Sequence, residues 1–122
     1  MSDLFAPQGG WRVRIRDLSG GAEDGIVEEI GGFASLMLAN AFARRYVRDS
    51  VERCRAPGLS PGAVLESWRA FGEDAEVVDA AEAGWHSEPE LGAFADHPAS
   101  AEERDWRSLD PRRDDDDQDE DS

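Results

Sequence analysis

Two histidines, His86 and His97, are the side chains of this sequence best suited to bind a transition metal, and acidic residues lie near both. Neutral imidazole and carboxylate groups both ligate divalent ions. The 11-residue separation of the histidines matches neither the i, i+4 spacing of a helical metal site nor a zinc-finger pattern. Since 28 of the 122 residues are acidic, an acid beside a histidine carries little information. We expect ordinary histidines and no metal site.

The single cysteine, Cys54, is the candidate nucleophile, and a single cysteine excludes an intramolecular disulfide framework. It falls on the apolar side of a predicted helix, where a buried thiol is inert and packs like a small apolar side chain. The sequence contains no lysine, so it has no P-loop, and its glycine pairs at 20–21 and 31–32 do not form a GxGxxG motif. These observations predict a protein that is not an enzyme and has no cofactor.

Arginine is the stronger chemical signal, because all 13 basic residues of the chain are arginine. Three of them alternate with apolar residues over positions 11–16 and would project from one face of a strand. Others recur on one face of a predicted helix. Arginine side chains presented in this way can bind phosphate groups. The candidate basic face consists of Arg12, Arg14, Arg16, Arg44 and Arg48.

The balance of charge favours a simpler interpretation of these arginines. Residues 1–71 contain nine arginines and nine acidic residues, so this part of the chain is neutral. A nucleic-acid footprint is normally a net basic domain. We therefore expect an ordinary solvated face, and nucleic-acid binding is the alternative.

The net charge of −15 belongs entirely to residues 72–122, which contain 19 acidic residues and four arginines. Within them, residues 114–121 read DDDDQDED, seven acids around one glutamine, without the glycine and terminal glutamate of a calcium loop. A block of like charges repels itself and has nothing to bury, so we expect it to be disordered. It could keep the protein soluble, cover the strand arginines, or bind a basic partner or nucleic-acid site.

Two strands and a long helix are the elements that would position the arginines. Alternation over residues 11–16 predicts a half-buried strand, and residues 25–30 predict a second strand that forms a hairpin with it. Over residues 33–54, apolar side chains recur with the helical period. This pattern predicts a helix of roughly five turns with one apolar face.

A second helix and a third strand are expected next. Ser60 followed by Pro61 is a good N-cap with proline at the first helical position, and Gly72 suits the left-handed position that ends a helix. Residues 75–79 predict a short strand at an edge. The predicted fold class is α+β: a small antiparallel sheet in the order β-β-α-α-β, with one long amphipathic helix packed on one face. An irregular C-terminal arm and a disordered acidic tail would follow.

The predicted arm is polar but contains three large aromatic residues. A capping box formed by Ser100 and Glu103 predicts a short helix that runs to about position 106. Because a domain of about 70 residues has a modest core, we favour docking of these aromatic side chains onto the domain itself. Contact with a partner is the functional alternative, since aromatic residues anchor interfaces. The candidate partner-binding residues are Trp85, Phe94, Trp106, Asp114, Asp115, Asp116 and Asp117.

The chain is thus divided into a flexible N-terminus (1–10), an α+β domain (11–80), an aromatic arm (81–110) and an acidic tail (111–122). We predict a small non-enzymatic accessory or adaptor protein, a monomer or weak dimer, that binds another protein through its acidic, aromatic-containing C-terminal region. One candidate for the surface that this region contacts on the partner is a basic one. The alternative is a nucleic-acid-related regulator, in which the tail gates binding by the arginines or blocks a DNA-binding protein.

Composition also bears on source and location. The absence of lysine and threonine favours residues with GC-rich codons and so predicts a high-GC bacterial source. The longest mostly apolar stretch, residues 33–43, is too short to span a bilayer. The N-terminal MSDLFAPQGG lacks the basic and apolar regions of a secretory signal. We therefore expect a cytoplasmic protein without membrane contact.

Overall fold

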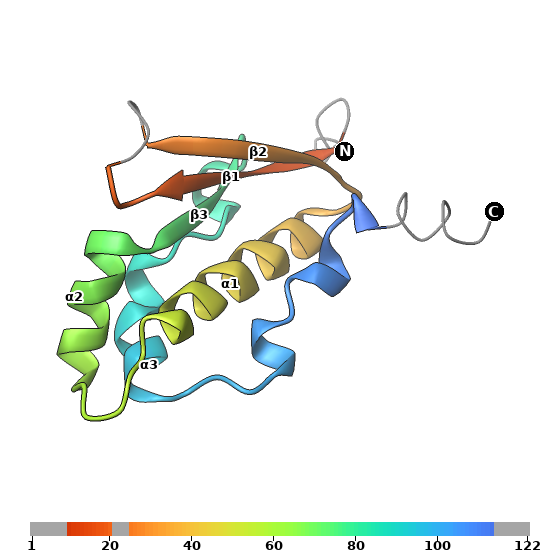
Figure 1. Ribbon diagram of the computed structural model, residues 1–122. Helices are drawn as coiled ribbons and strands as arrows, with labels where there is room; N and C mark the ends of the chain where they lie inside the picture. The colour runs from red at the N-terminus through yellow and green to blue at the C-terminus, as the bar shows by residue number, and fades with distance from the viewer. Residues whose placement is uncertain (1–9, 21–24, 114–122) are drawn as a thin grey trace.

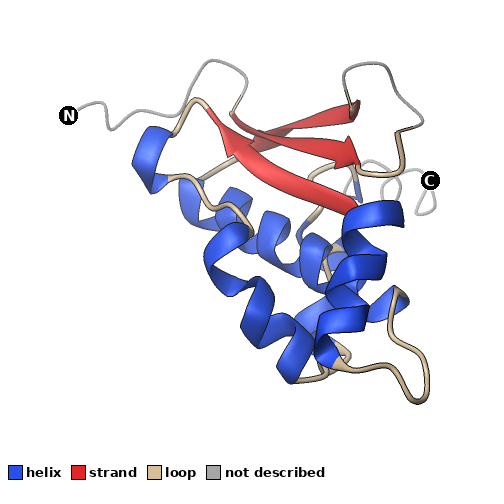
Figure 2. Ribbon diagram, turned by 90° about the vertical axis from the view of Figure 1, so that its left-hand side faces the viewer, coloured by secondary structure: helices blue, strands red, loops and turns tan. Residues whose placement is uncertain are grey.

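Three antiparallel strands form one sheet in the order β2-β1-β3 in a computed structural model that describes residues 10–20 and 25–113 (Figure 1). They are β1 (Trp11–Asp17), β2 (Ile26–Phe33) and β3 (Glu73–Val78). The first strand is central, and the third lies at an edge as predicted, although it begins two residues earlier than expected and ends one residue earlier. The helices of the described residues all lie on one side of the sheet and leave its other face uncovered (Figure 2). The predicted α+β class is confirmed.

The alternation along β1 divides its side chains between the two faces of the sheet. Val13 and Ile15 have no exposed surface and face the helices, whereas the arginines between them face outward. The second strand runs three residues further than predicted. Trp11 pairs with Phe33 and Val13 with Ile30, so β2 carries one extra residue between these pairs. Gly32, at φ +89°, adopts the left-handed conformation that such a bulge requires and that favours glycine.

The long helix α1 (Leu36–Arg53) covers the inner face of the sheet (Figure 1). It begins later than the apolar pattern predicted, because Phe33 belongs to β2 and Ser35 caps the helix. The Ser35 hydroxyl accepts a hydrogen bond of 3.1 Å from the backbone N–H of Leu38. The apolar face of the helix is fully buried against the strands: Ala39, Phe42, Ala43, Val47 and Val51.

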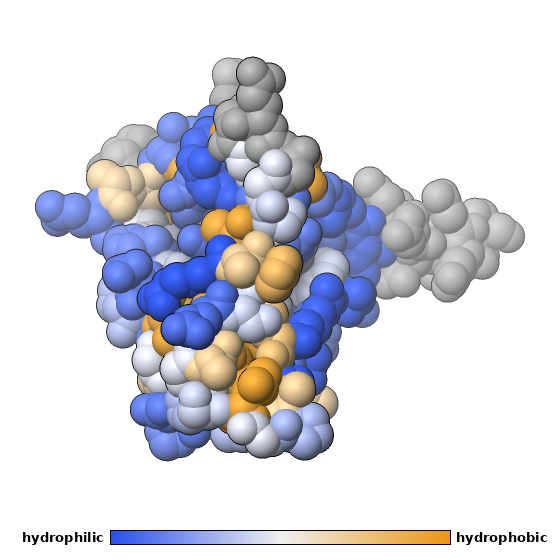
Figure 3. Space-filling model, turned by 60° about the vertical axis from the view of Figure 1, so that its left-hand side comes forward, coloured by the Kyte–Doolittle hydropathy of each residue, from blue (hydrophilic) through white to orange (hydrophobic). Residues whose placement is uncertain are grey.

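The second helix α2 (Pro61–Phe71) begins where the sequence predicted, with the Ser60 hydroxyl accepting from the N–H of Ala63 at 3.1 Å. The expectation for Gly72 is corrected. Its φ of −88° is not left-handed. Glycine is needed there because a Cβ atom would lie 2.3 Å from Cδ1 of Trp68. The α2 side of the molecule carries apolar surface among hydrophilic side chains (Figure 3).

After β3, the chain folds back over α1 and α2 as the aromatic arm (81–110), and residues 111–113 follow it as the last described residues. The arm contains a short helix that its sequence did not predict, α3 (Leu91–Asp96), which has no side-chain cap. The predicted capping box is present. Ser100 N donates to Oε1 of Glu103 at 2.8 Å, and Glu103 N donates to the Ser100 hydroxyl at 3.2 Å. It starts only a 3₁₀ turn (Glu102–Arg104), not a helix that continues to position 106.

Candidate functional site

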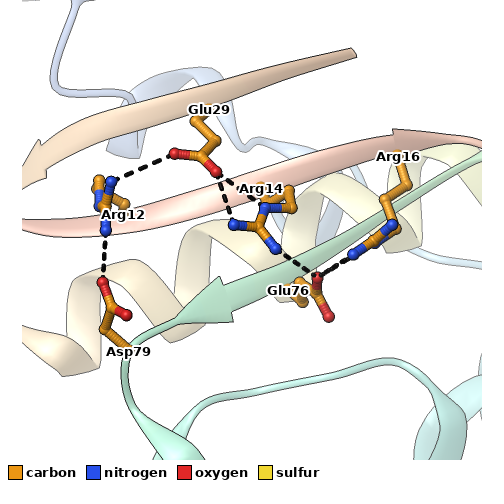
Figure 4. A network of polar contacts seen from close by, with 6 residues as sticks. All are labelled: Arg12, Arg14, Arg16, Glu29, Glu76 and Asp79. Carbon is orange, nitrogen blue, oxygen red and sulfur yellow. Dashed lines mark hydrogen bonds and ion pairs between the residues drawn. The ribbon is translucent and has the colours of Figure 1, made fainter. Parts of the chain in front are cut away.

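The uncovered face of the sheet carries a chain of ion pairs in which positive and negative side chains alternate (Figure 4). Each strand arginine meets at least one carboxylate from β2, β3 or the residue after β3. The nitrogen–oxygen distances are 2.5 Å for Arg12–Asp79, 3.4 Å for Arg12–Glu29, 2.8 Å for Arg14–Glu29, 3.8 Å for Arg14–Glu76 and 3.0 Å for Arg16–Glu76.

These six side chains sum to a formal charge of zero, so the face is not a basic footprint. The hydrogen bond to Asp79 raises the pKa of Arg12, as expected for a cation held by a carboxylate. Such pairs occupy part of the guanidinium donors and offset the positive charge that would attract a phosphate group. The three acidic partners lie 15 to 67 residues from the arginines in sequence, so local spacing gave no signal for them.

Arg44 and Arg48 lie on α1, on the helical side of the sheet, so the five predicted basic residues do not share one face. Their guanidinium carbons lie 5.3 Å and 4.7 Å from the centroid of the Phe94 ring. Arg44 also pairs with Glu90 at 2.9 Å, and Arg48 donates to the carbonyl of His97 at 3.0 Å. Arg48 is only 6% exposed. The arm therefore covers the helix face that was predicted to be solvated.

Phe94 and Trp85 attach the first half of the arm to the domain. Phe94 has no exposed surface, and its ring stacks on that of Trp85 with centroids 6.4 Å apart. The Trp85 indole donates to Glu90 at 2.6 Å, and its backbone N–H donates to the side chain of Asn40 at 2.8 Å. These contacts satisfy both N–H groups of Trp85 within the chain.

Trp106 attaches the second half. Its ring lies 5.7 Å from that of Phe42 and 4.9 Å from that of Tyr46, measured between centroids. Its indole donates to Asp49 at 3.2 Å, and the same buried carboxylate accepts from Arg104 at 2.8 Å. All three candidate aromatic residues are thus engaged with their own domain, as the self-docking interpretation expected.

Ion pairs of Arg112 hold the last described residues against β2. Its guanidinium pairs with Glu28 at 2.6 Å and with Asp110 at 2.8 Å. The hydrogen bonds that Arg112 donates to Asp110 and, to a lesser extent, to Glu28 raise the pKa of its guanidinium, although burial opposes the shift. Burial alone would raise the pKa of Asp110, but the hydrogen bonds from Arg112 lower it. The candidate residues Asp114 to Asp117 lie outside the described residues and follow directly in the sequence.

Beside this attachment lies a hollow of about 240 Å³, between the end of β2, the start of α1 and residues 108–113. Two neighbouring residues at the start of α1 are large, apolar and solvent-exposed: Met37 is 76% exposed and Leu38 is 40% exposed. The sequence indicated that these two side chains would be exposed, since neither belongs to the apolar stripe of the helix. The apolar side chains that line the hollow are Phe33, Ala34, Leu38, Leu109 and Pro111.

The remaining candidates are not brought together. His86 and His97 are exposed, and Cys54 is half-buried beside a second hollow of about 430 Å³ next to Phe71. Across residues 10–20 and 25–113, no three His, Cys, Asp or Glu side chains form a group that could hold a metal ion. The helices in that part of the chain are too short or too polar to cross a membrane. No protein-family model, curated protein or solved structure matches the chain.

Proposed function

We propose that this protein is a non-enzymatic, protein-binding accessory protein that contacts a basic partner surface at the end of the domain from which its acidic segment extends. The observation that supports the proposal is the attachment of Arg112 to Glu28 and Asp110. This attachment holds the chain against β2 two residues before the acidic segment begins. The start of β1, the end of β2 and the start of α1 lie at this same end (Figure 1).

The charge of the acidic segment gives the contact its electrostatic character. Seven acids in eight residues attract a basic surface over a distance set by the Debye length, about 8 Å at physiological ionic strength. Such attraction mainly accelerates association and weakens as salt rises. A partner bound in this way would therefore be recognised quickly and released by salt.

The aromatic arm is no longer part of the proposed contact. Phe94 is fully buried, and the indole N–H groups of Trp85 and Trp106 already donate to Glu90 and Asp49. The form of the nucleic-acid alternative in which arginines bind nucleic acid would require free arginines, whereas blockade of a DNA-binding protein by the acidic segment would not. Because Arg12, Arg14 and Arg16 are paired with carboxylates, we do not extend the proposal to nucleic acid.

Site-specific photo-crosslinking in cells tests this proposal. Benzoylphenylalanine replaces Met37 at the proposed contact or, as the matched control, the exposed Glu66 of α2. We expect an adduct of defined mass from position 37 only, which disappears when Asp114, Asp115, Asp116 and Asp117 are changed to asparagine. The same adducts from both positions, or an adduct that survives the asparagine changes, would contradict the proposal.

A further inference from the structure

We propose that the hollow at the start of α1 is a socket for one bulky apolar side chain of the partner, carried within a basic segment. This inference rests on the proposed function and specifies the chemistry of the partner. The size of the hollow supports it. About 240 Å³ lies below the roughly 300–1,000 Å³ of sites for drug-sized ligands, so the hollow suits a side chain better than a small molecule.

The lining of the hollow also favours an apolar occupant. Leu38 and Leu109 come from α1 and from the last 3₁₀ turn, and Pro111 follows that turn. Leu38 keeps 40% of its surface exposed in a chain whose other helical apolar residues mostly face the core. Next to it, the 76% exposed Met37 offers a flexible and polarisable side chain of the kind that adapts to different partners. Burial of these side chains under a partner would remove apolar surface from water.

The charges beside the hollow specify what should flank the apolar residue. Beside the hollow, Arg112 pairs with both Asp110 and Glu28 of β2, so these three side chains sum to a formal charge of −1. The acidic segment, with seven acids in eight residues, starts directly after Arg113, itself a lining residue. Because Asp114 directly follows a residue that lines the hollow, the acidic segment begins beside it. Charge complementarity therefore favours a partner segment with basic residues around its apolar one.

The inference can be tested with two fluorescein-labelled peptides, GRRGLGRRG and GRRGSGRRG, which differ only in the central leucine or serine. Anisotropy titrations use the full-length protein at 0.15 M salt. We expect the leucine peptide to bind about tenfold more tightly, because one leucine is buried. The variant Leu38→Ser should abolish this preference. Its matched control is Phe71→Ser, at an apolar residue that is 75% exposed on a different helix, and it should keep the preference.

The possible outcomes separate the two proposals. Equal affinity for both peptides, with binding lost when the acids at positions 114–117 become asparagine, overturns the socket but not the proposed function. No dependence of either peptide on these acids overturns the proposed function itself.

A third outcome would assign the hollow to the chain's own N-terminus. Gly10 lies against the end of β2, where a Cβ atom would come within 2.9 Å of the Cα atom of Gly32. Leu4 and Phe5 precede it closely in the sequence. If the leucine preference emerges only when Leu4→Ser and Phe5→Ser are combined, the chain itself occupies the hollow and the partner socket is overturned.

Discussion

The guanidinium carbon of Arg48 lies 4.7 Å above the ring of Phe94, and both side chains are removed from solvent. A cation over an aromatic ring contributes about 2 kcal/mol when the pair is desolvated. The contact joins the middle of α1 to α3, which is otherwise a short helix without a side-chain cap. Attachment of the arm therefore depends on a few tertiary contacts, and their removal should have measurable consequences.

Replacement of Phe94 by alanine should destabilise the protein by about 3–5 kcal/mol, because it opens a cavity in the core and removes the partner of two arginines and Trp85. Denaturant unfolding followed by circular dichroism measures this loss. The matched control is Phe71→Ala, at a position that is 75% exposed, and it should change stability by less than about 0.5 kcal/mol. If the loss for Phe94→Ala were as small as that for Phe71→Ala, the arm would add little to the stability of the core.

Replacement of Asp49 by alanine should release the second half of the arm without unfolding the domain. The change leaves Arg104 and the Trp106 indole without their common acceptor, which costs about 1–3 kcal/mol of docking free energy. Trypsin should then cleave after Arg104 and Arg107 about tenfold faster. Mass spectrometry of a digestion time course measures the rate. Glu66→Ala, at an exposed position of α2, is the control and should be cleaved like the wild type.

Removal of the carboxylates from the sheet face should create affinity for DNA. In a variant without residues 114–122, the changes Glu29→Gln and Glu76→Gln leave three arginines with only Asp79 as partner. We expect this variant to bind a 20-base-pair duplex about tenfold more tightly than its parent at 50 mM salt, with the difference lost at 0.5 M salt. Filter binding or anisotropy measures both. Equal binding by the parent would mean that the ion pairs leave the arginines free.

Glu90 should stabilise the protein at neutral pH and lose this effect in acid. Burial alone would raise its pKa, but hydrogen bonds from Arg44 and Trp85 lower the pKa below the ordinary 4.5. A depressed pKa contributes stability that is complete above the unfolded value and is lost as pH falls through the folded value. Glu90→Gln should therefore be less stable than the wild type at pH 7, and the difference should disappear well below pH 4.5. Unfolding free energies measured across this range would contradict the assignment if the difference were constant.

Asp74 should behave in the opposite way. Burial raises its pKa above the ordinary 3.8, although hydrogen bonds from Ser87 and from the Ala75 N–H oppose the shift. The carboxylate therefore costs stability when it is ionised, and this cost vanishes as pH falls through the raised value. Asp74→Asn should be more stable than the wild type at pH 7, with no advantage below pH 3.8. A stability loss at pH 7 would show that the ionised carboxylate is needed by its partners.

The local sequence was sufficient for most of the secondary structure. Ser60 and Pro61 start α2 where expected, and the reciprocal bonds of Ser100 and Glu103 form as the capping box predicted. These signals depend on hydrogen bonds between residues at most three apart, so they need no knowledge of the path of the chain. The alternation in β1 is equally local, because successive side chains of a strand point to opposite faces.

The predictions that were wrong concern positions where a contact with another part of the chain decides the local structure. The strand β2 continues past the glycine pair because Trp11, across the sheet, pairs with Phe33. Gly72 is required by the indole of Trp68 and not by a left-handed turn. Helical periodicity predicted a solvated face on α1, but periodicity reports which residues share a face and not what covers that face.

The sequence alone therefore determined the three strands, the two longer helices, the fold class and the separation of a neutral domain from an acidic C-terminal region. Only the tertiary structure decided which charges meet. Arg44 finds Glu90 across 46 positions and Arg12 finds Asp79 across 67. With 28 acidic residues available, every arginine has many possible partners in the sequence. An ion pair forms only within a few ångströms, so the path of the folded chain selects among them.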